Sequence, residues 1–245
     1  MATQIRILKC LRLAFGFLTV FPVGRVQAEE GELALASFFF PLVGMSLGFI
    51  QFWIWWLSFS WTQSLALSAF FGVLVLVIFT GGLHLDGVAD VCDAFWVSDR
   101  DRRKAVLKDS RLGTFGALGV FLFVILKLIL LMETRDFFYF LWAPLLGRLG
   151  VLELAALFPP FAEEGLGKEL MGRVSLFFSL FWMAVVGFLM LRFQGVEHLL
   201  KIGIHFGIIY LLGMVFKKRF GGLNGDMLGC TIEMGEALVL FLGRF

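Results

Sequence analysis

The sequence has few cysteines and little charge, and both scarcities limit what the protein can be. Three cysteines occur, Cys10, Cys92 and Cys230, and their wide scatter excludes a disulfide framework and favours a reducing, cytosol-facing environment. Charged side chains make up 16% of the residues, whereas 60% are apolar and 31 residues are phenylalanine. With a mean hydropathy of +0.91, this composition lies far outside that of soluble domains and indicates an integral membrane protein.

Features that would divide the chain or mark it for cleavage are also missing. No fixed-period repeat, low-complexity tract or linker occurs, so residues 1–245 are predicted to form one transmembrane helical domain. The basic residues near the start, Arg6, Lys9 and Arg12, are spread through apolar positions instead of preceding a clean apolar core. This pattern predicts an amphipathic helix on the membrane surface, with a short buried helix as the alternative.

Apolar windows of membrane length recur along the chain. A bilayer core about 30 Å thick needs about 20 mostly apolar residues per helix. The sequence therefore predicts an all-α, polytopic helical bundle with about seven transmembrane helices, at 34–57, 64–82, 113–132, 138–158, 175–192, 198–216 and 227–243. Glu233 and Glu236 interrupt the last of these spans, which makes it the weakest of the seven.

Basic residues fall mainly on one side of the predicted bundle. With the N-terminus inside, the outer ends of the spans hold only Arg135, Arg192, Lys201 and Arg244, and most other Lys and Arg residues are inside. Because positive charge gathers in cytoplasmic segments, we expect a prokaryotic plasma (inner) membrane protein whose polar segments face the cytoplasm.

The stretch TGGLHLDGVADVCDAF, residues 80–95, places acids directly after an uncharged run. Two glycines should end the second span and let the chain turn, so that His84 precedes the next helix. Spacings of four and three then place Asp86, Asp90 and Asp93 within about 40° of one another on one helical face. Carboxylates this close repel one another unless a divalent cation lies among them, and oxygen ligands favour Mg²⁺ or Mn²⁺ over zinc.

The alternative is that these acids form the solvated face of a cytoplasmic loop. Such a face usually carries mixed charge, whereas residues 83–97 contain no Lys or Arg. The absence of basic residues favours the metal site.

A basic loop, SDRDRRKAVLKDSRLGTFG, follows at residues 98–116. Its basic residues could bind a phosphate-rich substrate. For Arg100, Arg102, Arg103 and Lys104, an equally good explanation is the positive charge that normally flanks a membrane helix on its cytoplasmic side. Asp109, Ser110 and Arg111 lie at the mouth of the third span, where Gly113 and Gly116 permit close packing, and we interpret them as substrate contacts.

A second polar segment, KKRFGGLNGDMLGCTIEMGE, occupies residues 217–236. Asp226 and Glu233 are seven residues apart and so share a helical face, and acids in an apolar helix indicate a site facing the bundle interior. We expect this segment to converge with the aspartate stretch on one metal and diphosphate site. Arg148 is a further candidate anion contact, with snorkelling or a pair with Glu153 as alternatives.

These motifs resemble the cobalamin synthases, or adenosylcobinamide-GDP ribazoletransferases, over nearly the whole chain. Two departures are visible: Ala94 stands where the family typically has glycine, and Asn224 where it usually has threonine. The resemblance rests on FLTVFPVG (17–24), FFFPLVGMSLG (38–48), GGLHLDGVADVCDAF (81–95), DSRLGTFG (109–116), LLGR (145–148) and GGLNGDMLGCTIEMGE (221–236).

The resemblance implies a membrane-bound step late in vitamin B12 assembly. In this step, α-ribazole or its 5′-phosphate displaces GMP from adenosylcobinamide-GDP. The protein is also expected to contact a lipid bilayer and no nucleic acid polymer. Whether it forms a homo-oligomer is left open. Mg²⁺ would be held by Asp86, Asp90, Asp93 and Asp226, and His84 or an aspartate would accept the hydroxyl proton. The alternative for His84 is a structural role as the cap at the start of the helix. The implied substrate contacts are Asp109, Ser110, Arg111, Arg148, Asn224 and Glu233.

Two other functions fit parts of the pattern. A CDP-alcohol phosphotransferase also uses helix-borne aspartates, but its D-x-x-D-G-x-x-A-R spacing is not present here. An ion-coupled transporter carries acids on glycine-broken helices, but near the bilayer midplane instead of at the inner ends of spans.

Overall fold

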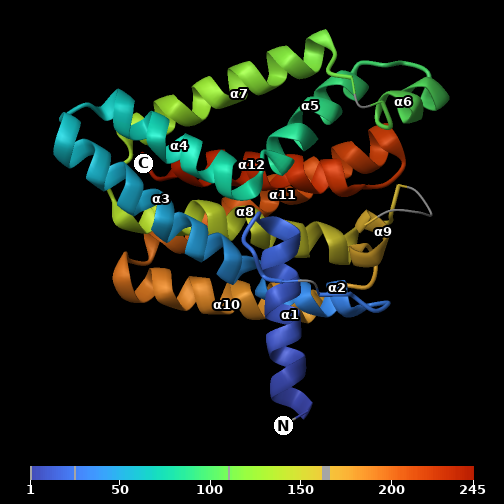
Figure 1. Cartoon of the computed structure of the whole chain (residues 1–245), viewed down its shortest axis with the longest axis horizontal. Coiled ribbons are helices and arrows are strands. Elements are labelled where there is room, and N and C mark those ends of the chain that lie inside the picture. Colours follow the sequence, from blue (N-terminus) through green and yellow to red (C-terminus); the bar gives the residue numbers. More distant parts are fainter. Residues whose placement is uncertain (1, 25, 110, 162–165) are drawn as a thin grey trace.

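The computed structural model describes residues 2–24, 26–109, 111–161 and 166–245 (Figure 1). Within these ranges the chain is helical, and the β-type pairing they contain is an isolated bridge between Pro160 and Leu223. The predicted all-α class is therefore confirmed. The elements in chain order are α1 (Ala2–Leu18), α2 (Glu32–Ala36), η1 (Ser37–Phe39), α3 (Phe40–Thr62), α4 (Leu65–Thr80), α5 (Leu83–Phe95), α6 (Arg100–Val106), α7 (Thr114–Glu133), α8 (Phe137–Leu157), α9 (Leu166–Leu170), α10 (Leu176–Phe193), α11 (Glu197–Phe220) and α12 (Gly225–Leu242).

A helix lies at each of the seven ranges predicted to span the membrane. Five continuous helical segments are long and apolar enough to cross, namely α2 to α3 together, α7, α8, α10 and α11. The pair α4 and α5 passes the same test only when taken together, although it is bent by 91°. The last helix, α12, carries Asp226, Glu233 and Glu236 within its 18 residues. The total of seven crossings stays a prediction.

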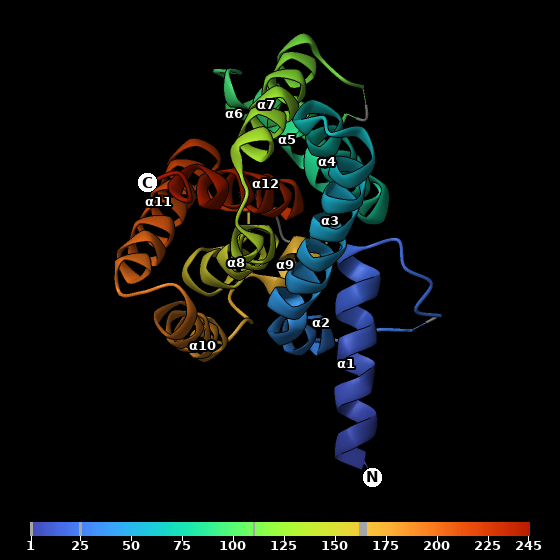
Figure 2. The same cartoon turned by 90° about the vertical axis from the view of Figure 1, so that its left-hand side faces the viewer.

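Helix α8 forms the centre of the bundle. Figure 2 shows it surrounded by α3, α10, α11 and α12, and 83% of its membrane-length window is buried. Lipid tails are as apolar as the helix surfaces, so such burial is stabilised mainly by close packing and by polar contacts between helices. The charged groups of α8 therefore lie inside the protein, where Arg148 and Glu153 are 0% and 5% exposed.

Helix α1 lies across the bundle helices and projects beyond them (Figures 1 and 2). Its second half packs against the bundle, where Leu13, Ala14 and Leu18 are buried. Its first half keeps apolar side chains exposed, including Ile5 and Leu8 at 62% and 57%. The short-buried-helix alternative therefore describes only the second half, and contact of the first half with a membrane surface stays a prediction.

The bend between α4 and α5 forms as the two glycines predict. Gly81 and Gly82 have φ angles of 63° and 73°, a left-handed conformation that other residues rarely adopt. These two residues complete the turn, so α5 begins at Leu83 and includes His84. The predicted position of His84 before the helix is therefore wrong, and Gly82, not His84, is the N-cap residue of α5.

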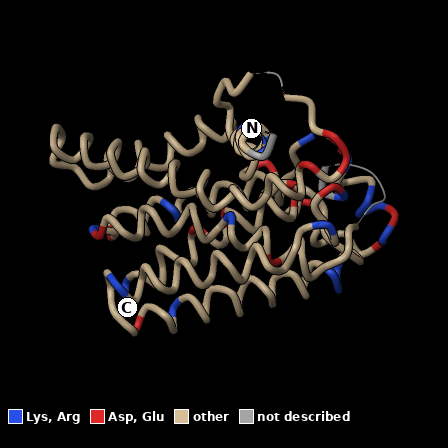
Figure 3. Tube along the Cα trace, turned by 90° about the horizontal axis from the view of Figure 1, so that it is seen from below, with Lys and Arg blue, Asp and Glu red and all other residues tan. Residues whose placement is uncertain are grey.

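Charged residues gather at one end of the molecule. Figure 3 shows acidic and basic residues concentrated at the end opposite the C-terminus, with few along the helices. This end contains the aspartate stretch and the basic loop.

Candidate active site

The two polar segments meet where α5 crosses α12. A Cβ atom added to Gly87 would overlap the backbone carbonyl of Asp226, so the two helices touch through backbone at this point. One turn further along α12, a Cβ atom added to Gly229 would lie 3.3 Å from the Cα atom of His84. The convergence predicted from the two glycine-opened segments is present in the fold.

This crossing gathers carboxylates that have no cation beside them in the described structure. Asp86 is exposed, whereas Asp90 and Asp226 are half-buried. The ion pairs among the described residues include none of these three. Their mutual repulsion makes the crossing a region of strong negative potential.

Asn224 positions one of these acids. It is the N-cap residue of α12, and its Oδ1 accepts a hydrogen bond from the backbone N–H of Met227 at 3.1 Å. Its Nδ2 donates to Oδ2 of Asp226 at 2.7 Å. Asn224 was predicted as a substrate contact, and in the structure its amide orients the Asp226 carboxylate.

Asp93 joins α5 to α7. Its two carboxylate oxygens accept hydrogen bonds from the backbone N–H groups of Gly113 and Gly116, each at 2.7 Å. These N–H groups have no partners within α7 because they belong to its first turn, where the helix dipole also favours an anion. The metal-ligand role predicted for Asp93 therefore competes with two strong protein contacts, which the acid spacing alone did not reveal.

Asp93→Asn should loosen α7. The amide keeps one acceptor oxygen but turns its NH₂ group toward the second backbone N–H, so we expect a loss of about 1.5–3 kcal/mol in the free energy of unfolding. Thermal and denaturant unfolding in detergent, followed by tryptophan fluorescence, measures this loss. Asp86→Asn is the matched control because Asp86 is exposed. Equal stability of the two variants would show that Asp93 does not hold α7.

The basic loop uses its arginines to close the end of α5. Arg103, only 5% exposed, donates hydrogen bonds to the carbonyls of Val97 and Ser98 at 2.8–3.0 Å. Arg219, from the end of α11, donates to the carbonyls of Phe95 and Val97 at 2.7 and 2.9 Å. Arg103 therefore donates hydrogen bonds to the free carbonyls after α5. Its guanidinium is not available to bind phosphate.

Asp109 and Arg111 lie at the mouth of α7, as predicted, and bind each other. The Nη2 atom of Arg111 lies 2.6 Å from Oδ2 of Asp109, and its Nε donates at 2.9 Å to Oδ1. These hydrogen bonds lower the pKa of Asp109 to about 2. The Arg111 side chain is 87% exposed. Ser110, the third predicted contact in this loop, lies outside the described residues.

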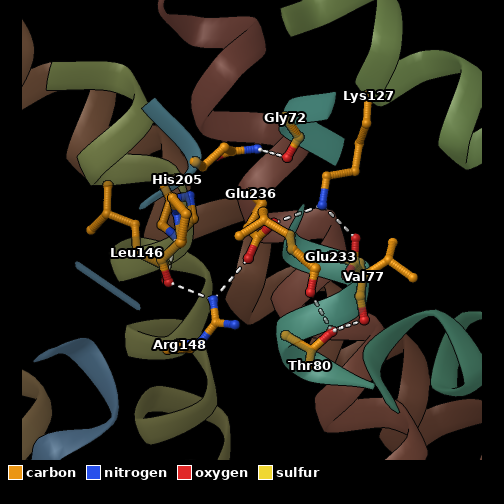
Figure 4. Close-up of polar contacts among 12 residues, drawn as sticks. Gly72, Val77, Thr80, Lys127, Leu146, Arg148, His205, Glu233 and Glu236 are labelled. Atoms are coloured by element: carbon orange, nitrogen blue, oxygen red, sulfur yellow. Dashed lines mark hydrogen bonds and ion pairs between the residues drawn. The ribbon is translucent and has the colours of Figure 1, made fainter. Parts of the chain in front are cut away.

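A buried network of four charges occupies the bundle interior (Figure 4). Lys127 of α7 lies 2.7 Å from both Glu233 and Glu236 of α12. Arg148 of α8, which is fully buried, binds the other oxygen of Glu236 at 2.8 Å and donates to the carbonyl of Pro144 at 3.0 Å. Two cations and two anions thus cancel in the interior.

This network gives protein partners to two residues that were predicted to contact substrate. Arg148 and Glu233 were expected to contact substrate, but their side chains pair inside the bundle with Glu236 and Lys127. The alternative pair of Arg148 with Glu153 is also wrong. A lone lysine in an apolar span needs an acidic partner, so Lys127 is the residue in the sequence that signals this pairing.

Two cavities flank the first turn of α5. The first, here called the inner cavity, measures about 520 Å³ and is lined by His84, Asn224 and Asp226 among others. The second, here called the open cavity, measures about 950 Å³, is wider at its mouth and is lined by Asp86. Phe17 and Leu83 belong to the walls of both cavities. The α5–α12 crossing therefore presents carboxylates to two adjoining spaces.

Gly87→Ala should separate α5 from α12. The added methyl group overlaps the Asp226 carbonyl, a backbone atom that cannot turn away, so the two helices must move apart. We expect turnover to fall at least about tenfold, because misplacing reacting groups by about 1 Å can cost more than that. Gly207→Ala is the matched control, since an added Cβ atom at that helical position meets nothing within 4 Å. Equal rates in both variants would contradict the need for this close approach.

Comparison with known proteins assigns this fold and site to a family. A family model described as cobalamin-5-phosphate synthase matches residues 10–243. The chain belongs to this family. A curated adenosylcobinamide-GDP ribazoletransferase of Klebsiella pneumoniae (strain 342) is 36% identical over 245 residues, covering 95% of this chain and 98% of that protein. One of Escherichia coli (strain K12 / DH10B) is 34% identical over 234 residues, covering 91% and 94%. No solved structure matches the chain.

Membership of this family makes the chain a transferase of cobalamin biosynthesis, and its apolar helices make it a membrane protein. The resemblance stated from the motifs is confirmed.

Proposed function

We propose that this protein joins adenosylcobinamide-GDP to α-ribazole or α-ribazole 5′-phosphate, giving adenosylcobalamin or its 5′-phosphate and GMP. The observation that carries the proposal is the crossing of α5 and α12, where Asp86 and Asp226 face two adjoining cavities. A reaction between two substrates needs two binding spaces that meet at the reacting phosphorus. We place the protein in the plasma membrane with this crossing on the cytoplasmic side, which the basic residues at the charged end support.

The proposed reaction is an in-line displacement at phosphorus. A hydroxyl oxygen of the ribazole forms a bond to the phosphorus attached to the cobinamide arm, and the bond from that phosphorus to the GMP oxygen breaks. We assign His84 or one of the aspartates to take the hydroxyl proton. His84 is 2% exposed, lines the inner cavity, and neither ring nitrogen has a partner in the described structure. GMP leaves with the electron pair of the broken bond.

Mg²⁺ is the cofactor that we propose for this crossing. The donor set fits a hard cation, because Asp86, Asp90 and Asp226 supply only carboxylate oxygens and pair with no described cation. Within the described ranges, no three His, Cys, Asp or Glu side chains are grouped closely enough to hold a metal ion by themselves. Mg²⁺ usually completes its coordination with water and substrate phosphates. When bound, it would neutralise charge on the diphosphate.

The decisive experiment is product formation in detergent. Purified protein is incubated with adenosylcobinamide-GDP, α-ribazole and Mg²⁺, and GMP and adenosylcobalamin are measured by mass spectrometry. We expect both products in equal amounts, and none when the protein or Mg²⁺ is left out. A transporter would form no product without a membrane, so absence of both products from folded protein would overturn the proposed reaction.

A further inference from the structure

The inner cavity has the size and walls of a small-molecule site. Its volume of about 520 Å³ lies within the range of about 300–1,000 Å³ that is typical of ligand pockets. Apolar side chains from separate parts of the chain form most of its wall, including Phe17, Val151, Phe161, Leu228 and Ile232. Such walls suit the flat face of an apolar base.

Polar residues also belong to the wall of the inner cavity. His84 lines it and is 2% exposed. The carboxylate of Asp226 and the amide of Asn224 line the same space.

Two lysines give the inner cavity a second polar feature. Lys108, just after α6, and Lys168, in α9, both line it, and both are exposed. They come from segments far apart in the sequence that the fold brings to one cavity. Two lysines in the wall of one small cavity favour an anionic ligand such as a phosphate monoester. Among the residues that the structure describes, none in the wall of the open cavity is basic.

The two cavities differ in the substrate that they can accept. The donor in the proposed reaction carries a corrin ring and is far larger than a nucleoside. The open cavity is the larger of the two, at about 950 Å³, and its wider mouth lets a donor of this size extend beyond it; Asp86 lies in its wall. The inner cavity, at about 520 Å³, suits the smaller substrate.

We propose that the inner cavity binds the acceptor as a nucleoside 5′-phosphate, with its base against the apolar wall and its phosphate held by Lys108 and Lys168. The acceptor's attacking hydroxyl then lies on the side of His84 and Asp226. This assignment rests on the proposed function. It makes the two lysines the residues that select the phosphorylated acceptor over the free nucleoside.

Steady-state kinetics with two acceptors test the assignment. For Lys108→Gln and Lys168→Gln, the ratio of the KM for α-ribazole 5′-phosphate to the KM for α-ribazole should rise at least about tenfold, because each change removes one charged contact to phosphate. Lys217→Gln is the matched control: Lys217 is exposed in the last turn of α11 and does not line the cavity. Its KM ratio should equal that of the unchanged protein.

A second variant tests the cavity itself. Gly225 lines the inner cavity, and a Cβ atom added there meets no atom within 4 Å, so Gly225→Leu fills space without a clash at the Cβ position. Its KM should rise for both acceptors at least about tenfold, while its KM for adenosylcobinamide-GDP stays within twofold. Calorimetric titration with α-ribazole 5′-phosphate should show the same loss of affinity.

The outcomes separate this inference from the proposed function. No GMP release by the unchanged protein with either acceptor would overturn the reaction. Normal GMP release, with KM ratios in both lysine variants equal to that of Lys217→Gln, would overturn the phosphate site alone. An increase in the donor KM instead of the acceptor KM in Gly225→Leu would exchange the two cavities and so overturn the assignment.

Discussion

Asp86→Asn, Asp90→Asn and Asp226→Asn should each lower the rate of GMP release at least about a hundredfold, equivalent to about 2.7 kcal/mol of transition-state stabilisation. Each change keeps the shape of the side chain but removes the charge that a divalent cation binds. Turnover is measured in detergent with saturating substrates. Asp101→Asn, an exposed acid in α6, is the matched control and should keep its rate within twofold.

A double variant shows whether the two helices serve one site. When two groups act as a unit, replacing either one removes most of their shared effect on the rate. When two groups act independently, the rate losses of the two replacements multiply. Asp86→Asn combined with Asp226→Asn should therefore be scarcely slower than the slower single variant, and each single variant should need more Mg²⁺ for half-maximal rate. Multiplied losses with an unchanged Mg²⁺ midpoint would assign the two carboxylates to separate roles.

Lys127→Met should destabilise the protein by about 3–5 kcal/mol, because it leaves Glu233 and Glu236 in the bundle interior with one cation between them. Methionine fills a similar volume, so the loss reports the charge and not a cavity. The free energy of unfolding in detergent is measured against Lys217→Met, in which an exposed lysine changes and the expected shift lies within about 0.5 kcal/mol.

Restoring the charge balance of the buried network should recover much of the free energy of unfolding that Lys127→Met loses. Lys127→Met combined with Glu233→Gln removes one charge of each sign, and Arg148 still pairs with Glu236. We expect the double variant to be more stable than Lys127→Met alone by at least about 1.5 kcal/mol. A double variant less stable than either single variant would show that the network is held by packing and not by charge balance.

Local signals in the sequence predicted the helices and the meeting of the two acidic segments. Apolar runs set the seven helical ranges, and the glycine pair at 81–82 set the sharp turn before α5. The apolar runs and the glycine turn could be interpreted in advance because each depends only on neighbouring residues.

The pairings across helices could not be predicted in the same way. Whether Arg148 contacts Glu153 or Glu236 depends on how α8 and α12 are rotated about their axes, and one sequence does not fix that rotation. Likewise, Asp93 binds the first turn of α7 because the loop between them brings it there. The acid spacing within α5 contains no information on that loop.

The last turn of α1 lies between the inner cavity and the open cavity, which are the two compartments that it separates. Gly16 and Phe17 belong to the walls of both cavities, so a movement of this turn that enlarges one compartment takes volume from the other. A ligand that displaces the partition changes the affinity of the neighbouring compartment, and linkage makes that effect reciprocal. The first half of the same helix projects beyond the bundle and is continuous with this turn.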